Sequence, residues 1–87
     1  MPRISAFYGI VIAMFWNEGV HARPHFHAEY AGHEASIAID GTVLGGSLPP
    51  RALGFVREWA KLHEAELHAN WDRAREMRPL DPIDPLP

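Results

Sequence analysis

The chain has 87 residues, 47% hydrophobic and 22% charged, a composition typical of a folded globular protein rather than of a disordered or fibrous one. Its length falls below that of most domains, so we expect one domain over residues 1–87 and no second module. The formal net charge of −3 argues against broad attraction to nucleic acid, and the absence of cysteine excludes disulfides and thiolate zinc sites.

The sequence shows no segment typical of export or of a membrane span. The most apolar run, residues 7–16, is far shorter than the ~20 residues that a membrane-crossing helix needs. The first five residues lack the apolar stretch and cleavage site of a signal peptide. We therefore expect a cytoplasmic protein with no membrane partner.

The first half, residues 1–46, has the alternation of an antiparallel β-meander with three or four strands. Residues 8–16 carry β-branched and aromatic side chains on both alternating sets, which predicts a core strand. Residues 25–30 alternate more strictly and predict a strand with one polar face. Its apolar face comprises Phe26, Ala28 and Tyr30, and its polar face comprises His25, His27 and Glu29.

A third strand is predicted over residues 34–40 by the same alternation. If Ala31–Gly32 forms a tight turn, this strand pairs with the preceding one and places Glu34 directly opposite Glu29. Like charges in such a position are unfavourable unless a cationic group sits between them. His27 then lies opposite Ser36.

The sheet gives way to helix near residue 46. Asp40–Gly41 is a strong hairpin signal, so residues 42–44 are predicted to return as a short fourth strand that Gly45–Gly46 terminates. Over residues 49–77, apolar side chains recur every three or four positions, which predicts one or two helices. One unbroken helix would be ~40 Å long, so we expect either a break, near Gly54 or within residues 61–64, or a helix whose end projects toward a partner.

The last segment, residues 79–87, repeats an acidic–proline–aliphatic pattern that favours extended geometry. We interpret it as a tail that packs on the domain or on a partner, with fraying as the alternative. Together, the elements predict an α+β fold in which a three- to four-stranded antiparallel β-meander packs against one or two C-terminal helices.

Histidine is concentrated around the second predicted strand. His25 and His27 emerge on one face ~6.5–7 Å apart at the backbone. In one interpretation they act as general base and general acid on an RNA phosphodiester, while Arg23 stabilises the developing negative charge. His21, in the preceding loop, and Glu29, next on the same face, complete this candidate catalytic set.

Two other interpretations of the histidine cluster remain open. Three nitrogen or oxygen ligands with an open position would suit zinc or another divalent cation. The ligands would be His25 and His27 together with His21, Glu29 or His63. Alternatively, the cluster is structural or part of a protein interface, with its rings packed on Phe26 and Trp16.

Several short motifs extend across most of the chain, and the most specific is Pro24-His25-Phe26-His27. The others are Met1–Ser5, Phe7–Ile10, His21, Leu48–Pro49, Val56, Trp59, Glu66–Leu67, Asn70–Trp71, Ile83 and Pro85–Leu86. In these motifs the chain resembles the small bacterial family catalogued as domain of unknown function 4160. The resemblance implies no specific activity, because that family is defined by sequence.

The resemblance does imply a genetic setting. Members of this family are often encoded beside a second short protein, an arrangement typical of toxin–antitoxin pairs. Combined with the histidine pair, it gives the expectation of a toxin-like, histidine-dependent ribonuclease or phosphodiesterase. The alternatives are a metal-dependent hydrolase and a non-catalytic protein-interaction module. Since so small a domain can leave apolar surface uncovered, we expect a partner, either an antitoxin-like protein or a second copy in a homodimer.

Overall fold

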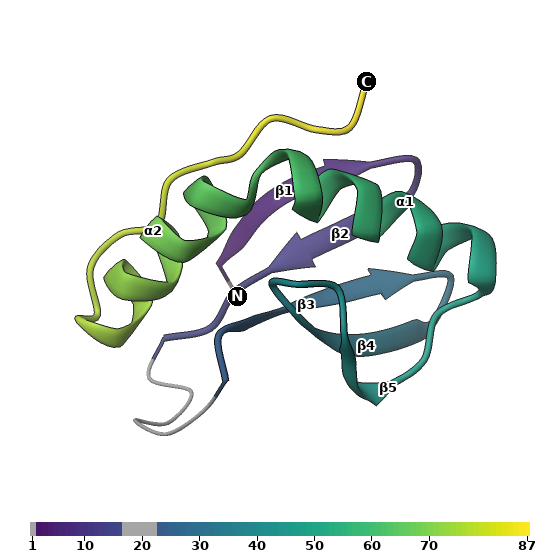
Figure 1. The fold of residues 1–87 in the computed structure, drawn as a ribbon, viewed down its shortest axis with the longest axis horizontal. Coiled ribbons are helices and arrows are strands. Elements are labelled where there is room, and N and C mark those ends of the chain that lie inside the picture. Colours follow the sequence, from purple (N-terminus) through teal and green to yellow (C-terminus); the bar gives the residue numbers. More distant parts are fainter. Residues whose placement is uncertain (1, 17–22) are drawn as a thin grey trace.

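The computed structural model describes residues 2–16 and 23–87 (Figure 1). A five-stranded antiparallel meander, in the order β1-β2-β3-β4-β5, is followed by two helices. The strands are β1 (Arg3–Phe7), β2 (Ile10–Ala13), β3 (His25–Tyr30), β4 (His33–Ala38) and β5 (Val43–Gly46), and the helices are α1 (Pro50–Leu62) and α2 (Glu64–Arg75). The predicted α+β fold is confirmed, with more strands than expected.

The additional strand comes from the N-terminal segment, where a single strand over residues 8–16 was predicted. That prediction is wrong, because Tyr8 and Gly9 have φ angles of 51° and 77° and reverse the chain between β1 and β2. Two successive positive φ angles are typical of a type I′ hairpin turn, which suits the twist of the two strands. The Tyr-Gly pair is not the usual signal for this turn, and the apolar residues on both of its sides concealed it.

The β3–β4 hairpin forms as the sequence predicts. Ala31 and Gly32 have φ angles of 49° and 81°, and the register pairs His27 with Ser36 and Glu29 with Glu34. The expectation that the two glycines near residue 46 end the sheet is corrected, since both belong to β5 and pair with β4. The hydrogen bonding between β4 and β5 even continues one residue past the last pair, Ala35 with Gly46, because Ser47 N donates to Glu34 O at 3.0 Å.

The helices cover one face of the sheet, and the core lies between the two layers (Figure 1). The predicted break within residues 61–64 is confirmed at His63, whose φ of −117° and ψ of 26° are not helical. Trp59 fills the centre of the core and contacts the rings of Phe7 and Phe26. No helix in the described part of the chain has both the length and the apolar character that crossing a membrane requires.

The proline-rich tail packs on the domain, as one of the two interpretations anticipated. It runs back past the helices toward β1 (Figure 1), where Ile83 N donates to Ile4 O at 2.7 Å. Trp59 Nε1 donates to Asp84 O at 2.8 Å, and Asn70 makes two 2.9 Å hydrogen bonds with the backbone of Asp81. Ile83 and Leu86 are buried in the same core cluster as the strands.

Candidate functional site

His27 and Glu29 of β3 lie on the face of the sheet that the helices leave uncovered, here called the open face. Phe26 and Ala28 point into the core and are almost fully buried, so the alternation of the strand directs His27 and Glu29 to the opposite side. β2 and β4 flank them, with Ala13 and Ser36 in register with His27. The predicted two-faced character of β3 is therefore confirmed.

Four rings form a continuous row at the end of the sheet where β3 begins. Phe15 contacts His27 edge to face at 4.6 Å between centroids, and His27 contacts His25 in the same manner at 5.2 Å. His25 in turn lies 5.2 Å from Trp71, which α2 supplies. The row brings His25 and His27 together, as the spacing along the strand predicts, and holds each imidazole against a second aromatic side chain.

The hydrogen bond of His25 defines which of its nitrogens is basic. Its Nδ1 lies 2.7 Å from the carbonyl oxygen of Arg23, and a carbonyl only accepts, so Nδ1 carries the proton. In neutral His25 the lone pair is therefore on Nε2. His27 Nδ1 lies 3.4 Å from Ser36 Oγ, near the upper limit of a hydrogen bond.

The Arg23 side chain is held by the turn between β4 and β5. Its guanidinium forms a close ion pair with the Asp40 carboxylate and lies 3.5 Å from Thr42 Oγ1. The backbone N–H of Thr42 donates to Asp40 at 2.9 Å. This bond and the Thr42 hydroxyl are the main causes that hold the pKa of Asp40 below its usual value, against an opposing effect of desolvation, and Arg23 adds a smaller contribution in the same direction as Thr42.

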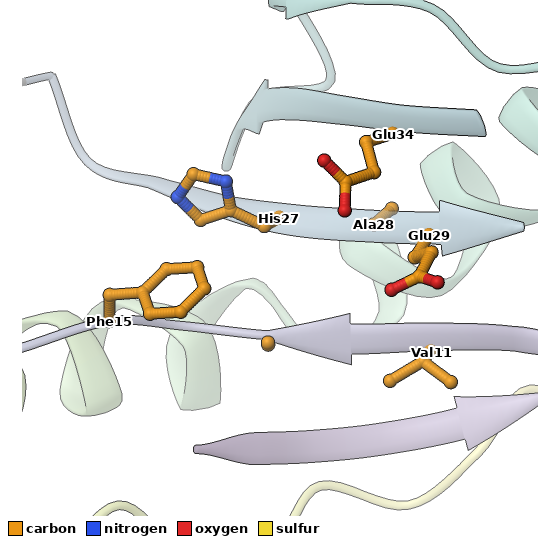
Figure 2. A pocket seen from close by; sticks show the side chains of 7 residues that line it. Val11, Phe15, His27, Ala28, Glu29 and Glu34 are labelled. Carbon is orange, nitrogen blue, oxygen red and sulfur yellow. The ribbon is translucent and has the colours of Figure 1, made fainter. Parts of the chain in front are cut away.

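A small hollow of about 100 Å³ lies on the open face beside the ring row. Figure 2 shows the rings of Phe15 and His27 at one end and the carboxylates of Glu29 and Glu34 further along the strands. Ala13, the last residue of β2, has a smaller side chain than the two lining residues on either side of it in the chain, Val11 and Phe15, and so leaves space between them. Its lining consists of Val11, Ala13, Phe15, His27, Ala28, Glu29 and Glu34.

The remaining candidate ligands are not gathered at this hollow. His63 lies at the junction of α1 and α2, where its Nδ1 is 2.7 Å from Glu66 Oε1 and its ring is 5.7 Å from that of Trp59. His21 lies outside the described residues. Within residues 2–16 and 23–87, no three histidine, aspartate or glutamate side chains are placed to share a metal ion. The metal interpretation therefore depends on His21 as the third ligand.

Two residues of the site were given no functional role in the sequence analysis. Phe15 and Trp71 were treated as core or strand residues, yet they flank the two imidazoles. Phe15 shares an alternating face with Val11 and Ala13, a signal that becomes useful only when the pairing of β2 with β3 is known. Trp71 is eight residues into α2, and its contact with His25 depends on the helix break at His63.

Comparison with known proteins gives one match. A family model described as a domain of unknown function (DUF4160) matches residues 9–72. The matched segment includes the whole of β3, β4, β5 and α1, and therefore His25, His27 and the hollow. No curated protein and no solved structure matches the chain significantly.

Proposed function

The chain belongs to the DUF4160 family, as its motifs predicted, and because that family has no assigned activity we propose a function from the site itself. We propose that the chain is the toxin-like component of a bacterial two-protein module and cleaves RNA phosphodiester bonds with His25 and His27. The observation that carries the proposal is the adjacent pair of imidazoles, of which His25 has a fixed tautomer. The module and its cytoplasmic setting are part of the proposal.

The two imidazoles are assigned different roles. Because Nδ1 of His25 is held by the Arg23 carbonyl, Nε2 of His25 takes the proton from a ribose 2′-hydroxyl. The 2′-oxygen then forms a bond to phosphorus while the bond to the 5′-oxygen breaks. Protonated His27 donates to the departing 5′-oxygen, so the products end in a 2′,3′-cyclic phosphate and a 5′-hydroxyl.

In this proposal Arg23 does not itself stabilise the negative charge that develops on the phosphate. Its guanidinium is paired with Asp40, and its backbone carbonyl is the group that contacts His25. We therefore assign Arg23 as a positioning residue that anchors His25 through the backbone. An Arg23→Gln variant should retain much of the activity, whereas loss of either imidazole should not.

The test is cleavage of a single-stranded RNA by the purified chain. His25→Ala and His27→Ala should each reduce the rate by ~10²–10⁴-fold, because each removes one proton-transfer partner. The rate should fall on both the acid and the alkaline side of its optimum, and DNA should resist because it lacks the 2′-hydroxyl. Product ends are read by mass spectrometry, and circular dichroism verifies that each variant is folded.

His68→Ala is the matched control, since His68 is exposed on α2. Its rate should equal that of the native chain, with or without a chelator. Unchanged cleavage by folded His27→Ala protein contradicts the proposal. Cleavage that a chelator abolishes and zinc restores replaces it with the metal alternative, whose third ligand would be His21.

A non-catalytic interaction module is the second candidate function. The observation that favours it is the exposure of large apolar side chains on several elements, all with more than 40% of their surface accessible. They are Tyr8, Trp16, Leu44, Leu62 and Met77. A stable complex with the neighbouring gene product, in the absence of any RNA cleavage, would establish this function in place of the catalytic one.

A further inference from the structure

We propose that the hollow on the open face binds the guanidinium group of an arginine side chain presented by a partner protein. The proposal does not require His25 and His27 to be catalytic. It rests on three features of the hollow, namely its opposed carboxylates, its aromatic wall and its small floor.

The carboxylates of Glu29 and Glu34 supply the charge. The two residues are direct partners across the β3–β4 hairpin, and both are exposed. Neither side-chain carboxylate makes an ion pair or hydrogen bond with another described residue. Like charges directly opposed in a sheet destabilise it, so a cation seated between them removes a repulsion as well as adding an attraction.

The aromatic wall and the small floor favour a planar cation. Phe15 presents its ring at one end of the hollow (Figure 2). Ala13, which also lines the hollow, has only a methyl side chain and therefore leaves room for a ligand. A guanidinium is flat, stacks on an aromatic face and donates in a fork that matches carboxylate oxygens. The ammonium of lysine is more strongly hydrated and lacks this geometry, so arginine fits the hollow better.

Six of the seven arginines of the chain interact with groups outside the hollow. Arg23, Arg73, Arg75 and Arg78 form ion pairs with Asp40, Asp81, Asp72 and Glu76 respectively. Arg57 donates to Gly41 O at 2.9 Å, and Arg51 lies over the Phe55 ring. Neither Arg3 nor Lys61 lines the hollow. Within the described part of the chain, no positively charged side chain offsets the repulsion between the Glu29 and Glu34 carboxylates. We therefore assign the cation to a partner protein.

Because the hollow lies beside His27, an arginine bound in it would also affect the proposed catalytic site. His27 is one of its lining residues, so an arginine seated there would touch His27 and cover it. If the proposed catalytic function holds, a partner that binds in this way would also inhibit the chain. If it fails, the hollow remains a protein-binding site.

The experiment is an NMR titration of the native chain with the blocked peptide Ac-Gly-Arg-Gly-NH2. We expect saturable shifts of the amide signals of Val11, Phe15 and Glu29. The same peptide with citrulline, which is neutral and nearly isosteric, should give none. Replacing either carboxylate in Glu29→Gln or Glu34→Gln should weaken binding about twofold to fivefold, the range of a single exposed ion pair. Ala13→Val should abolish binding by filling the hollow.

Matched variants separate local from general effects. Ala65→Val adds the same two methyl groups at an exposed α2 position that does not line the hollow, and should bind as the native chain does. Glu58→Gln removes an exposed carboxylate from α1 and should also bind normally.

The proposal is overturned if the arginine peptide gives no saturable shifts, or if citrulline or Ala13→Val gives the same shifts. A free nucleoside that shifts these signals when the arginine peptide does not would assign the hollow to RNA instead. RNA cleavage is not measured, so this outcome is independent of the catalytic test.

Discussion

Asp40 shows how one exposed side chain organises the approach to β3. Its carboxylate holds the Thr42 backbone on one side and the Arg23 guanidinium on the other. Arg23 in turn provides the carbonyl that fixes the His25 tautomer. A surface carboxylate that makes little contact with the core therefore contributes to the geometry of the imidazole pair.

Asp40 should also make stability depend on pH in the acid range. Its pKa is lowered in the folded chain, chiefly by Thr42, so its contribution is present above the ordinary carboxyl pKa and is lost as the pH falls through the lowered value. In Asp40→Asn this contribution is absent at every pH. Urea unfolding should show that the native chain loses its advantage over the variant on acidification.

The comparison needs a control carboxylate, and Glu58 on α1 provides one because it is exposed and forms no ion pair with another described residue. Glu58→Gln should leave the acid dependence of unfolding close to that of the native chain. Parallel stability curves for the native chain and Asp40→Asn would contradict the assigned role of Asp40.

At the scale of elements, β5 depends on a glycine that no other residue can replace without strain. Gly46 has a φ of 70°, and a Cβ atom there would lie 2.1 Å from Glu34 O. That oxygen already accepts the Ser47 N–H, so it has little freedom to move. The close approach of the β4 and β5 backbones is therefore built on the absence of a side chain.

Neighbouring glycines give a sharp prediction. Gly46→Ala should lower the free energy of unfolding by ~1–3 kcal/mol, because both the positive φ and the backbone contact are unfavourable for alanine. Gly45→Ala, with nothing within 4 Å of the added Cβ, should change it by less than ~0.5 kcal/mol. Thermal denaturation of the two variants checks the difference, and equal melting temperatures would show that this contact is unimportant.

How far the sequence predicts the elements depends on whether each carries its own local signal. The β3–β4 hairpin has strict alternation and a glycine in its turn, so the bounds of β3 and the register follow from the chain, whereas β4 was predicted over residues 34–40 and covers His33–Ala38. The turn at Tyr8–Gly9 has apolar neighbours on both faces and was missed. The pairing of Ala13 with His27 spans a loop without a two-residue turn signal, so neither the hollow nor the role of Phe15 follows from sequence.

At the scale of the whole molecule, Asn70 joins the tail to the helices. It is fully buried, and its side-chain amide donates to Asp81 O while its carbonyl oxygen accepts from Asp81 N, each at 2.9 Å. Arg73 donates to the same carbonyl oxygen at 3.0 Å. The sequence predicts that the tail is extended, but not where it docks. The docking site depends on the Asn70 side chain, and the helical periodicity around Asn70 predicts only an apolar stripe.

Removing this connection should release the tail. Asn70→Ala leaves the Asp81 backbone groups without these partners and should lower the free energy of unfolding by ~1–3 kcal/mol. The tail should also become accessible to carboxypeptidase, measured by mass spectrometry over time. His68→Ala, two residues away on the exposed side of α2, should leave both properties unchanged. A tail that stays protected in Asn70→Ala would assign its docking to Ile83 and Leu86 instead.

The contact between Ile4 and Ile83 also sets the order in which the chain can be completed during synthesis. All five strands and both helices precede residue 83, so a nascent chain has its whole sheet before it has the segment that bonds to β1. Until residues 83 and 84 have left the ribosome, the Ile4 carbonyl and the indole of Trp59 lack these partners. The native edge of the sheet can therefore be completed only after both helices have been synthesised.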